Sequence, residues 1–278
     1  MTTFRTTTSS SRRPSSPDGA LPVSTPAVPL FQELVAPPDW RMADFISDLH
    51  LQAGEPATFD AWRNYMATSP ADAVFILGDL FEAWVGDDAA VSHGFEADCA
   101  AVLKATAARL AVFFMHGNRD FLVSAGLMQA TLCTLLADPT VLTFLGQRSL
   151  LTHGDALCLD DTEYQAFRMQ VRSPAWKREF LARPLAERRR IARGLREQSD
   201  VRKQSGVSYG DVDARAATAW LHAANTRVMI HGHTHKPADH DIGSGLRRIV
   251  LSDWDAAAAV PRMQVLRVSN AGAQRIHL

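Results

Sequence analysis

The sequence predicts an α/β fold, and three observations support this prediction. From Met42 onward, short apolar runs rich in β-branched and aromatic residues recur along the chain, and each is four to five residues long, as buried strands are. Amphipathic stretches lie between the early runs, and strands that alternate with helices form an α/β fold. The length of 278 residues suits one large domain, or one domain that carries an insertion.

The expected elements follow one another in order. Five runs are expected as strands, at residues 43–46, 73–77, 111–115, 149–152 and 227–230. Helices are expected between the early strands, at residues 57–68, 95–109 and 124–135. Residues 161–222 contain no strand candidate and are expected to form several consecutive helices, so we predict a helical cap inserted into the domain. Two further β-like runs, 248–251 and 263–268, close the chain.

The first 38 residues differ in composition from the rest. Twelve of them are Ser or Thr and seven are Pro, so half of the segment cannot contribute to a core. Arg5, Arg12 and Arg13 faintly resemble a targeting peptide, but no continuous apolar segment of the secretory kind accompanies them. We predict a disordered N-terminal extension over residues 1–38 and a single domain over 39–278.

Charge and cysteine content exclude several classes of protein. The 29 Lys and Arg residues balance 30 Asp and Glu residues, which argues against a disordered polyelectrolyte and a globally basic nucleic-acid-binding protein. Cys99, Cys133 and Cys158 form no CxxC pattern, so a disulfide scaffold is not expected and a cytoplasmic setting fits best. The longest apolar run, 110–115, is far shorter than the roughly 18 residues that cross a bilayer.

Potential metal ligands follow all five strand runs. Because ligands bind beyond the carboxyl ends of strands in open α/β sheets, these residues can converge although they are far apart in sequence. A single Asp or His at a strand end is more often a turn former, a helix cap or an ordinary buried residue. Five such endings together favour a metal centre. Its seven candidate ligands are Asp48, His50, Asp79, Asn118, His153, His233 and His235.

The donor atoms restrict the metal. Carboxylate, amide and imidazole donors without a thiolate suit Mn²⁺, Fe²⁺, Co²⁺ or Zn²⁺ better than Ca²⁺ or a structural zinc. Seven ligands are too many for one tetrahedral ion, whereas two ions that share a bridging carboxylate would use them all. Two ions about 3.5–4 Å apart can activate a water molecule and stabilise charge on a phosphoryl group.

The order of these motifs, D-x-H, G-D, G-N, H-G and G-H-x-H, resembles the calcineurin-like metallophosphoesterases. The resemblance covers residues 45 to about 251 and implies an αββα sandwich of two β-sheets flanked by helices. It also implies which ligands bind which ion, with Asp79 as the bridge. The first ion would be held by Asp48, His50, Asp79 and His235, and the second by Asp79, Asn118, His153 and His233.

Arg119 occupies the position after G-N, where many members of that superfamily have a His that protonates the leaving alkoxide. A guanidinium cannot act as a general acid, but it can bind a phosphate through two hydrogen bonds. Because a phosphate leaves as a stable anion without an acid, Arg119 favours cleavage of a pyrophosphate over an alkyl phosphodiester. A structural ion pair is the alternative role for Arg119.

Longer strings are similar to the UDP-2,3-diacylglucosamine hydrolase family of lipid A biosynthesis. The string E-A-W-V-G-D-D at residues 82–88 is especially discriminating, since generic phosphoesterases lack it. The family cleaves the pyrophosphate and releases UMP and 2,3-diacylglucosamine 1-phosphate, typically with manganese. The resemblance therefore implies a pyrophosphate hydrolase with two divalent ions, most often Mn²⁺. It implies that Asp79, Asn118 and Arg119 serve catalysis, and that Asn118, Arg119 and His233 contact the substrate.

The cap composition fits a lipid that carries phosphates. Residues 161–203 contain twelve Lys or Arg against six Asp or Glu, together with apolar residues at helix-like spacing. Such a cap could bind phosphates and acyl chains, and could lie on the anionic cytoplasmic face of the inner membrane. A solvated face of a packed helix is the alternative. The resemblance implies substrate contacts from Asp161 and Ser199. Beyond Ser199 this sequence departs from the family pattern, because Lys203 and Gly206 stand where the family has an Asn and a Lys. Lys203 therefore supplies a basic group at a shifted position.

Two other functions stay open at the level of sequence. The first is another phosphoesterase, acting on cyclic nucleotides or nucleic acid. The second is a non-catalytic binding scaffold, which the presence of all seven ligands disfavours. Residues 252–255 could line the site or form an ordinary turn. The sequence indicates no nucleic-acid partner and predicts no oligomeric state.

Overall fold

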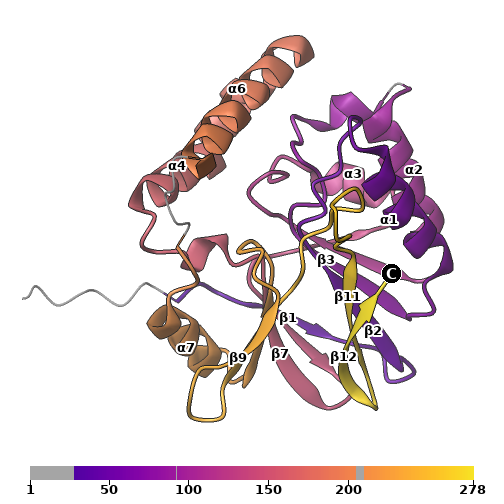
Figure 1. The fold of residues 1–278 in the computed structure, drawn as a ribbon, viewed down its shortest axis with the longest axis vertical. Coiled ribbons are helices and arrows are strands. Elements are labelled where there is room, and N and C mark those ends of the chain that lie inside the picture. Colours follow the sequence, from indigo (N-terminus) through magenta and orange to yellow (C-terminus); the bar gives the residue numbers. More distant parts are fainter. Residues whose placement is uncertain (1–27, 92, 205–209) are drawn as a thin grey trace, which may run out of the picture.

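The computed structural model describes residues 28–91, 93–204 and 210–278, and over residues 198–204 it describes the helical backbone without the side chains. Two six-stranded β-sheets pack face to face, and helices cover their outer faces (Figure 1). The predicted αββα sandwich is therefore confirmed. Within the described ranges, no helix has both the length and the apolar character needed to cross a membrane.

The first sheet has the strand order β12-β11-β2-β3-β4-β5. Strands β2 to β5 are parallel neighbours, whereas β11 runs antiparallel to β2 and to β12. Residues alternate between its two faces, as the strand period requires: Phe45, Phe75 and Phe113 stack toward the second sheet, with neighbouring ring centroids 4.9 and 4.6 Å apart. The strands are β2 (Met42–Ile46), β3 (Ala73–Leu77), β4 (Ala111–Met115), β5 (Thr134–Leu136), β11 (Gln264–Ser269) and β12 (Gly272–His277).

The second sheet has the strand order β1-β6-β7-β8-β10-β9. Strands β7, β8 and β10 are parallel neighbours, and the hairpin of β6 and β7 and the edge strand β9 add antiparallel pairs. Its inner face contributes Leu142, Leu151 and Ile230 to the core between the sheets. The strands are β1 (Gln32–Val35), β6 (Thr140–Phe144), β7 (Gln147–Thr152), β8 (Val228–His231), β9 (Ala238–Asp241) and β10 (Arg247–Val250).

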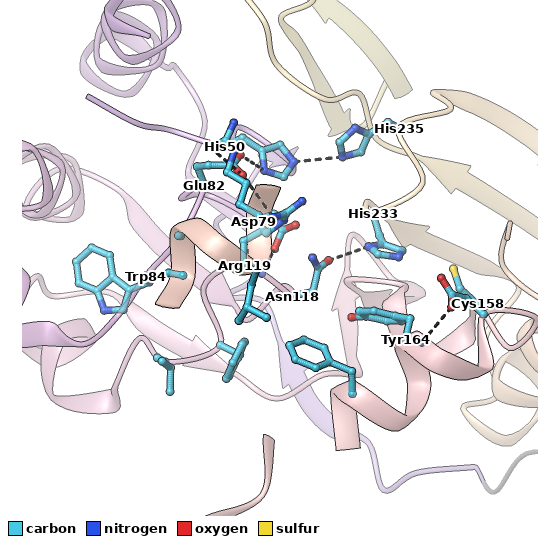
Figure 2. A pocket seen from close by; sticks show the side chains of 18 of the residues that line it. His50, Asp79, Glu82, Trp84, Asn118, Arg119, Cys158, Tyr164, His233 and His235 are labelled. Atoms are coloured by element: carbon cyan, nitrogen blue, oxygen red, sulfur yellow. Dashed lines mark hydrogen bonds and ion pairs between the residues drawn. The ribbon is translucent and has the colours of Figure 1, made fainter. Parts of the chain in front are cut away.

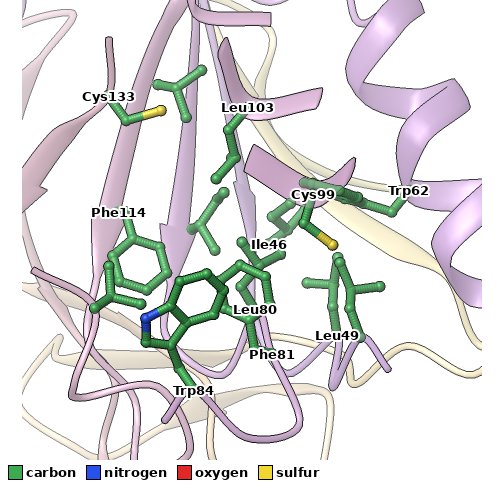
Figure 3. Close-up of a cluster of buried hydrophobic side chains, with 14 of the residues drawn as sticks. Ile46, Leu49, Trp62, Leu80, Phe81, Trp84, Cys99, Leu103, Phe114 and Cys133 are labelled. Carbon is green, nitrogen blue, oxygen red and sulfur yellow. The ribbon is translucent and has the colours of Figure 1, made fainter. Parts of the chain in front are cut away.

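Helices on both sides complete the sandwich. The first sheet is covered by α1 (Pro56–Thr68), α2 (Phe95–Ala107) and α3 (Ala125–Ala130). Trp62 of α1 and Leu103 of α2 pack there in one apolar cluster with Phe114 of β4 (Figure 3). The second sheet is covered by α7 (Ala214–Ala223), whose apolar face meets β6, β7 and β8.

The cap consists of three consecutive helices that extend beyond the sheets (Figure 1). They are α4 (Thr162–Arg172), α5 (Pro174–Leu181) and α6 (Leu185–Gln204). Ser173 separates the first two, and its hydroxyl caps α5 by accepting a hydrogen bond from the backbone N–H of Trp176. Two short 3₁₀ helices, η1 (Asp87–Ala90) and η2 (Asp155–Leu157), lie in the loops after β3 and β7.

The structure differs from the sequence prediction at three boundaries. Residues 32–35, predicted as part of a disordered extension, form β1 because they pair in parallel with β6; the prediction for residues 1–27 lies outside the described residues. The helix predicted over 124–135 ends at Ala130, and its last residues form β5 instead. The cap predicted over 161–222 is shorter, because the last part of that range is α7, which packs on the second sheet.

Candidate metal centre

The seven predicted ligands come together at the carboxyl ends of five strands. Figure 2 shows five of them: His50, Asp79, Asn118, His233 and His235. The seven follow β2, β3, β4, β7 and β8, and these strands belong to both sheets. The parallel registers of β2 with β3 and of β7 with β8 bring the strand ends side by side. The site therefore spans the top of the sandwich, where the two sheets meet.

The first cluster contains Asp48, His50 and His235, whose ligand atoms lie within 4.8 Å of one another. The Nε2 atoms of His50 and His235 are 3.2 Å apart, and Nε2 of His235 is 3.4 Å from Oδ1 of Asp48. The other carboxylate oxygen of Asp48 accepts hydrogen bonds from the Ser47 hydroxyl and the His233 backbone N–H, at 2.6 and 2.8 Å. Oδ1 is buried and accepts no well-formed hydrogen bond from the residues that the structure describes. Such a buried carboxylate oxygen fits a cation ligand.

The second cluster contains Asp79, Asn118, His153 and His233. Oδ1 of Asn118 lies 3.0 Å from Nε2 of His153 and 2.9 Å from Nδ1 of His233. Nε2 of His153 is 3.8 Å from Oδ2 of Asp79. Ligand atoms of Asp48, Asp79 and His153 also lie within 4.8 Å of one another, so the two clusters are continuous. This donor set, without a thiolate, fits divalent transition-metal ions.

Backbone strain is concentrated at these ligands. Five of the seven have a positive φ, a conformation that costs a residue other than Gly about 1–3 kcal/mol. The angles are 57° at Asp48, 49° at His50, 52° at Asp79, 67° at His233 and 52° at His235. The fold holds these side chains in place at an energetic cost, and such strain is typical of functional sites.

Two glycines allow the loops to approach one another. A Cβ atom on Gly117 would overlap Oδ1 and the backbone nitrogen of Asp79, and one on Gly232 would overlap the side chains of Ser47 and Asp48. Any side chain at these positions would therefore separate the metal-binding loops. This explains the glycine in the G-N and G-H-x-H motifs.

Burial and neighbouring charges shift the pKa values of His153 and His233 in opposite directions. Burial disfavours the charged form of His153, but the negative charges of Asp79, Asp48 and Asp155 outweigh it and raise the pKa of His153 to about 9. Burial, followed by the positive charge of His153, lowers the pKa of His233 to about 3. Burial also acts to raise the pKa of Asp48, but the close approach and charge of His235 hold that pKa far below its usual value. Carboxylates that remain ionised while buried attract cations, and a cation bound there would displace the proton of His153.

Glu82 connects the first cluster to two arginines (Figure 2). Its carboxylate lies 3.1 Å from Nδ1 of His50, 3.5 Å from Arg119 and 3.1 Å from Arg196 of the cap. The ion pair predicted as an alternative for Arg119 is therefore present, and the Arg119 backbone N–H also donates to Oδ1 of Asp79 at 2.8 Å. Sequence reasoning assigned no role to Glu82, although it lies in the discriminating string E-A-W-V-G-D-D.

Asp155 connects the second cluster to the cap. It is fully buried and accepts hydrogen bonds from the Tyr164 hydroxyl, Arg168 and Arg172, at 2.7, 2.8 and 3.1 Å. The Tyr164 ring stacks on His233, with centroids 5.9 Å apart. Burial opposes ionisation of Asp155, but Arg172 and Arg168 hold its pKa well below the usual value. The only sequence signal for this role was its place directly after the H-G motif.

A cavity of about 830 Å³ extends from the metal centre beneath the cap. At one end it is lined by ligands, including Asp79, Asn118 and His233, together with Arg119 and the predicted contact Asp161. Ser199 and Lys203 lie in the last turns of α6, outside the described side chains, so their substrate contacts stay predictions. The other end is apolar and is lined by Trp84, Val85, Phe121, Leu122, Phe167, Trp176, Phe180, Ala192 and Leu195.

The family model that matches this chain agrees with the class that the fold and donor set define. The model of the calcineurin-like phosphoesterase family matches residues 43–237. A solved archaeal phosphodiesterase aligns with 85% of this chain and 99% of its own at 13% identity, with a TM-score of 0.42.

Curated relatives are more specific. A UDP-2,3-diacylglucosamine hydrolase of Xanthomonas campestris is 44% identical over 79% of this chain and 94% of its own. Proteins of the same name from Chromobacterium violaceum and Cellvibrio japonicus are 45% and 42% identical, over 76% of this chain and 89% and 90% of their own. The chain therefore belongs to the calcineurin-like phosphoesterases and, within them, to the UDP-2,3-diacylglucosamine hydrolase family. Both resemblances predicted from the motifs are confirmed.

Proposed function

We propose that the chain hydrolyses the pyrophosphate bond of UDP-2,3-diacylglucosamine to UMP and 2,3-diacylglucosamine 1-phosphate, a step of lipid A biosynthesis. The observation that carries this proposal is the continuous cavity that joins a metal centre to an apolar wall. A substrate for such a cavity has a phosphate group next to acyl chains. The names of the curated relatives describe a substrate of this kind.

Some side chains of the site would bind the ions, and others would bind the phosphate. The seven clustered ligands would hold two divalent ions, which would activate a water molecule and neutralise phosphoryl charge. Arg119, which lines the cavity beside Asn118, would bind a phosphate oxygen and stabilise the charge that develops there. The bond between one phosphorus and the bridging oxygen breaks, and the departing phosphate needs no proton from Arg119. The apolar wall would hold the acyl chains and exclude water from them.

We assign Mn²⁺ as the most effective ion. Imidazole, amide and carboxylate donors in one site suit Mn²⁺, whereas the absence of Cys from the ligand set makes a thiolate-bound zinc unsuitable. Metal-free protein reconstituted with Mn²⁺, Co²⁺, Zn²⁺ or Mg²⁺ should release UMP fastest with Mn²⁺. Faster release with another ion at equal occupancy would refute this assignment.

The decisive assay measures UMP release from UDP-2,3-diacylglucosamine by the purified chain, with and without a chelator. We expect release of UMP and of 2,3-diacylglucosamine 1-phosphate in equal amounts, loss of release with the chelator, and recovery on addition of Mn²⁺. A chain that hydrolyses aryl phosphodiesters or cyclic nucleotides but not the UDP-lipid would instead support a different phosphoesterase.

We also propose peripheral binding to an anionic membrane through the cap. Met169 and Leu181 are 71% and 42% exposed on the cap, and three arginines are exposed there as well: Arg178, Arg190 and Arg193. Exposed apolar side chains next to basic ones suit an anionic lipid surface. Cosedimentation with vesicles should increase with their content of anionic lipid, and replacing the three arginines by Ala should reduce it.

A matched control replaces three exposed arginines outside the cap, Arg63, Arg215 and Arg227, by Ala. This variant should cosediment as the unchanged chain does. Equal losses in the two variants would mean that total charge, and not the cap surface, drives binding. No cosedimentation of the unchanged chain would refute the membrane proposal.

A further inference from the structure

A second, smaller cavity of about 150 Å³ adjoins the metal centre. It shares five lining residues with the large cavity, so the two cavities meet at the metal centre: His50, Glu82, Arg119, Arg196 and His235. Its other lining residues come from the loop before α1 and from the segment between β10 and β11, and none of these comes from the cap. They are Gln52, Glu55, Trp254, Asp255 and Arg262.

The two cavities have opposite chemical character. Away from the shared residues the large cavity is mostly apolar, whereas the small one presents an amide, two carboxylates and a guanidinium beside one indole ring. A volume of about 150 Å³ accommodates roughly one six-membered ring and excludes an acyl chain. The small cavity is thus suited to a polar, ring-sized group attached to a phosphate.

We propose that this small cavity binds the ribose ring of the UMP half of the substrate. The inference rests on the proposed function, in which the bond that breaks joins a lipid half to a nucleotide half. If the acyl chains occupy the large cavity, the nucleotide half needs a polar site on the opposite side of the scissile bond. The small cavity is such a site, because both cavities share the arginines that stand beside the metal ligands.

The polar groups of the cavity are fixed in position. Gln52 accepts a hydrogen bond from Arg196 at 3.0 Å and donates one to Glu55 at 2.7 Å. Asp255 is paired with Arg262 at 3.3 Å. The carboxylates can accept hydrogen bonds from the ribose hydroxyls, and the Gln52 amide can also donate to or accept from these hydroxyls.

Trp254, one of the residues that line the small cavity, is hydrogen-bonded to a candidate metal ligand. Trp254 is 3% exposed, and its backbone N–H donates to the carbonyl oxygen of Asp48 at 3.0 Å. The distance between this residue and the metal centre is therefore set by the fold. This also gives a function to the segment 252–255, which the sequence left between a site segment and an ordinary turn.

The test compares the inhibition constants of UMP and inorganic phosphate against UDP-lipid hydrolysis by the Mn²⁺-loaded chain. Both inhibitors present a phosphate to the metal centre, so their ratio isolates the contribution of the nucleoside. UMP should bind more tightly than phosphate to the unchanged chain. Gln52→Ala and Asp255→Ala should each lower that preference about fivefold, as expected for one lost hydrogen bond.

The control is Phe167→Ala, which alters only the large cavity. It should raise KM for the UDP-lipid and leave the ratio of the two inhibition constants unchanged. If both small-cavity variants hydrolyse the UDP-lipid and keep the full preference for UMP, the ribose binds elsewhere and the inference is wrong, while the proposed function stands. An unchanged chain that releases no UMP from the UDP-lipid would overturn the proposed function and this inference with it.

Discussion

Glu82 contacts one candidate ligand of the first ion and two arginines. A carboxylate 3.1 Å from Nδ1 of His50 favours a proton on that nitrogen, and so favours the tautomer that presents Nε2 to a metal ion. The same carboxylate pairs with Arg119 and Arg196 beside the candidate metal ligands. One side chain therefore orients a metal ligand and both arginines.

We predict that Glu82→Gln weakens Mn²⁺ binding about 10–100-fold, because the amide holds the His50 imidazole and the two arginines less strongly. Calorimetric titration of the metal-free variant with Mn²⁺ measures this directly, and circular dichroism checks that it is folded. The matched control is Glu55→Gln, which makes the same chemical change at an exposed carboxylate and should leave Mn²⁺ affinity unchanged. Equal Mn²⁺ affinity of Glu82→Gln and the unchanged chain would contradict the assigned role.

The pair of Asp211 and Arg248 gives a pH-dependent contribution to stability. Asp211 accepts two hydrogen bonds from the Arg248 guanidinium, at 2.6 and 3.0 Å. These bonds lower the pKa of Asp211 to about 2, against the opposing effect of burial. Because the folded pKa lies below the ordinary value of 3.8, the stabilisation is present above about pH 4 and is lost as the pH falls toward 2.

Asp211→Asn should therefore lower the free energy of unfolding near neutral pH by about 1 kcal/mol or less, since the carboxylate is partly exposed and screened by solvent. Urea unfolding of the variant and the unchanged chain measures the difference. The difference should shrink as the pH falls below about 4. A difference that stays constant or grows on acidification would contradict this account.

At the residue scale, the sequence predicted which side chains cluster at the candidate metal centre better than it predicted the side chains that contact them. Asp79 and His233 could be found because each follows an apolar run and so must lie at a strand end. Glu82 and Asp155 act through contacts with other side chains that are far away in sequence, and no local pattern encodes such contacts.

At the scale of elements, the string E-A-W-V-G-D-D forms the loop that docks the cap. Arg188 of α6 is 3% exposed, and its guanidinium donates hydrogen bonds to the carbonyl oxygen of Val85 and to the carboxylate of Asp88. Gly86 lies between them with a φ of 130°, and a Cβ there would overlap the Arg188 guanidinium. The string E-A-W-V-G-D-D therefore has two structural roles: it supplies Glu82 to the candidate metal centre, and it forms the surface on which α6 packs.

We predict that Gly86→Ala displaces the start of α6, at a cost of about 1–3 kcal/mol from backbone strain and overlap. Limited proteolysis should cleave the cap faster, and KM for the UDP-lipid should rise. Gly54→Ala is the matched control, because nothing lies within 4 Å of a Cβ at Gly54. If both variants resist proteolysis equally, the docking role of Gly86 is wrong.

Most elements with a clear apolar pattern were predicted, although the buried strand β6 was missed. Elements defined by their neighbours were not predicted. β2, β3 and β4 are apolar runs that are buried almost throughout, so their own residues indicate a buried strand. β1 and β9 are edge strands whose residues alternate between half-buried and exposed, so their strand conformation depends on pairing with β6 and β10. Their sequences contain no such information.

At the scale of the whole molecule, the net charge of −1 hides a separation of charge. Residues 161–203 carry a net charge of +6, which leaves −7 for the rest of the chain. Part of the positive charge joins the cap to the acidic body: Arg188 pairs with Asp88 and Arg189 with Glu96. The proposed membrane binding depends on the exposed arginines of the cap, Arg178, Arg190 and Arg193.

We propose that a two-ion centre bridged by Asp79 carries out hydrolysis of the UDP-lipid. The most direct measurement is UMP release from UDP-2,3-diacylglucosamine by Asp79→Ala and by the unchanged chain, both with Mn²⁺ and both shown to be folded. We predict release by the unchanged chain and only background release by the variant, because removing the shared carboxylate disrupts both ion sites. Release by Asp79→Ala at the rate of the unchanged chain would contradict the claim.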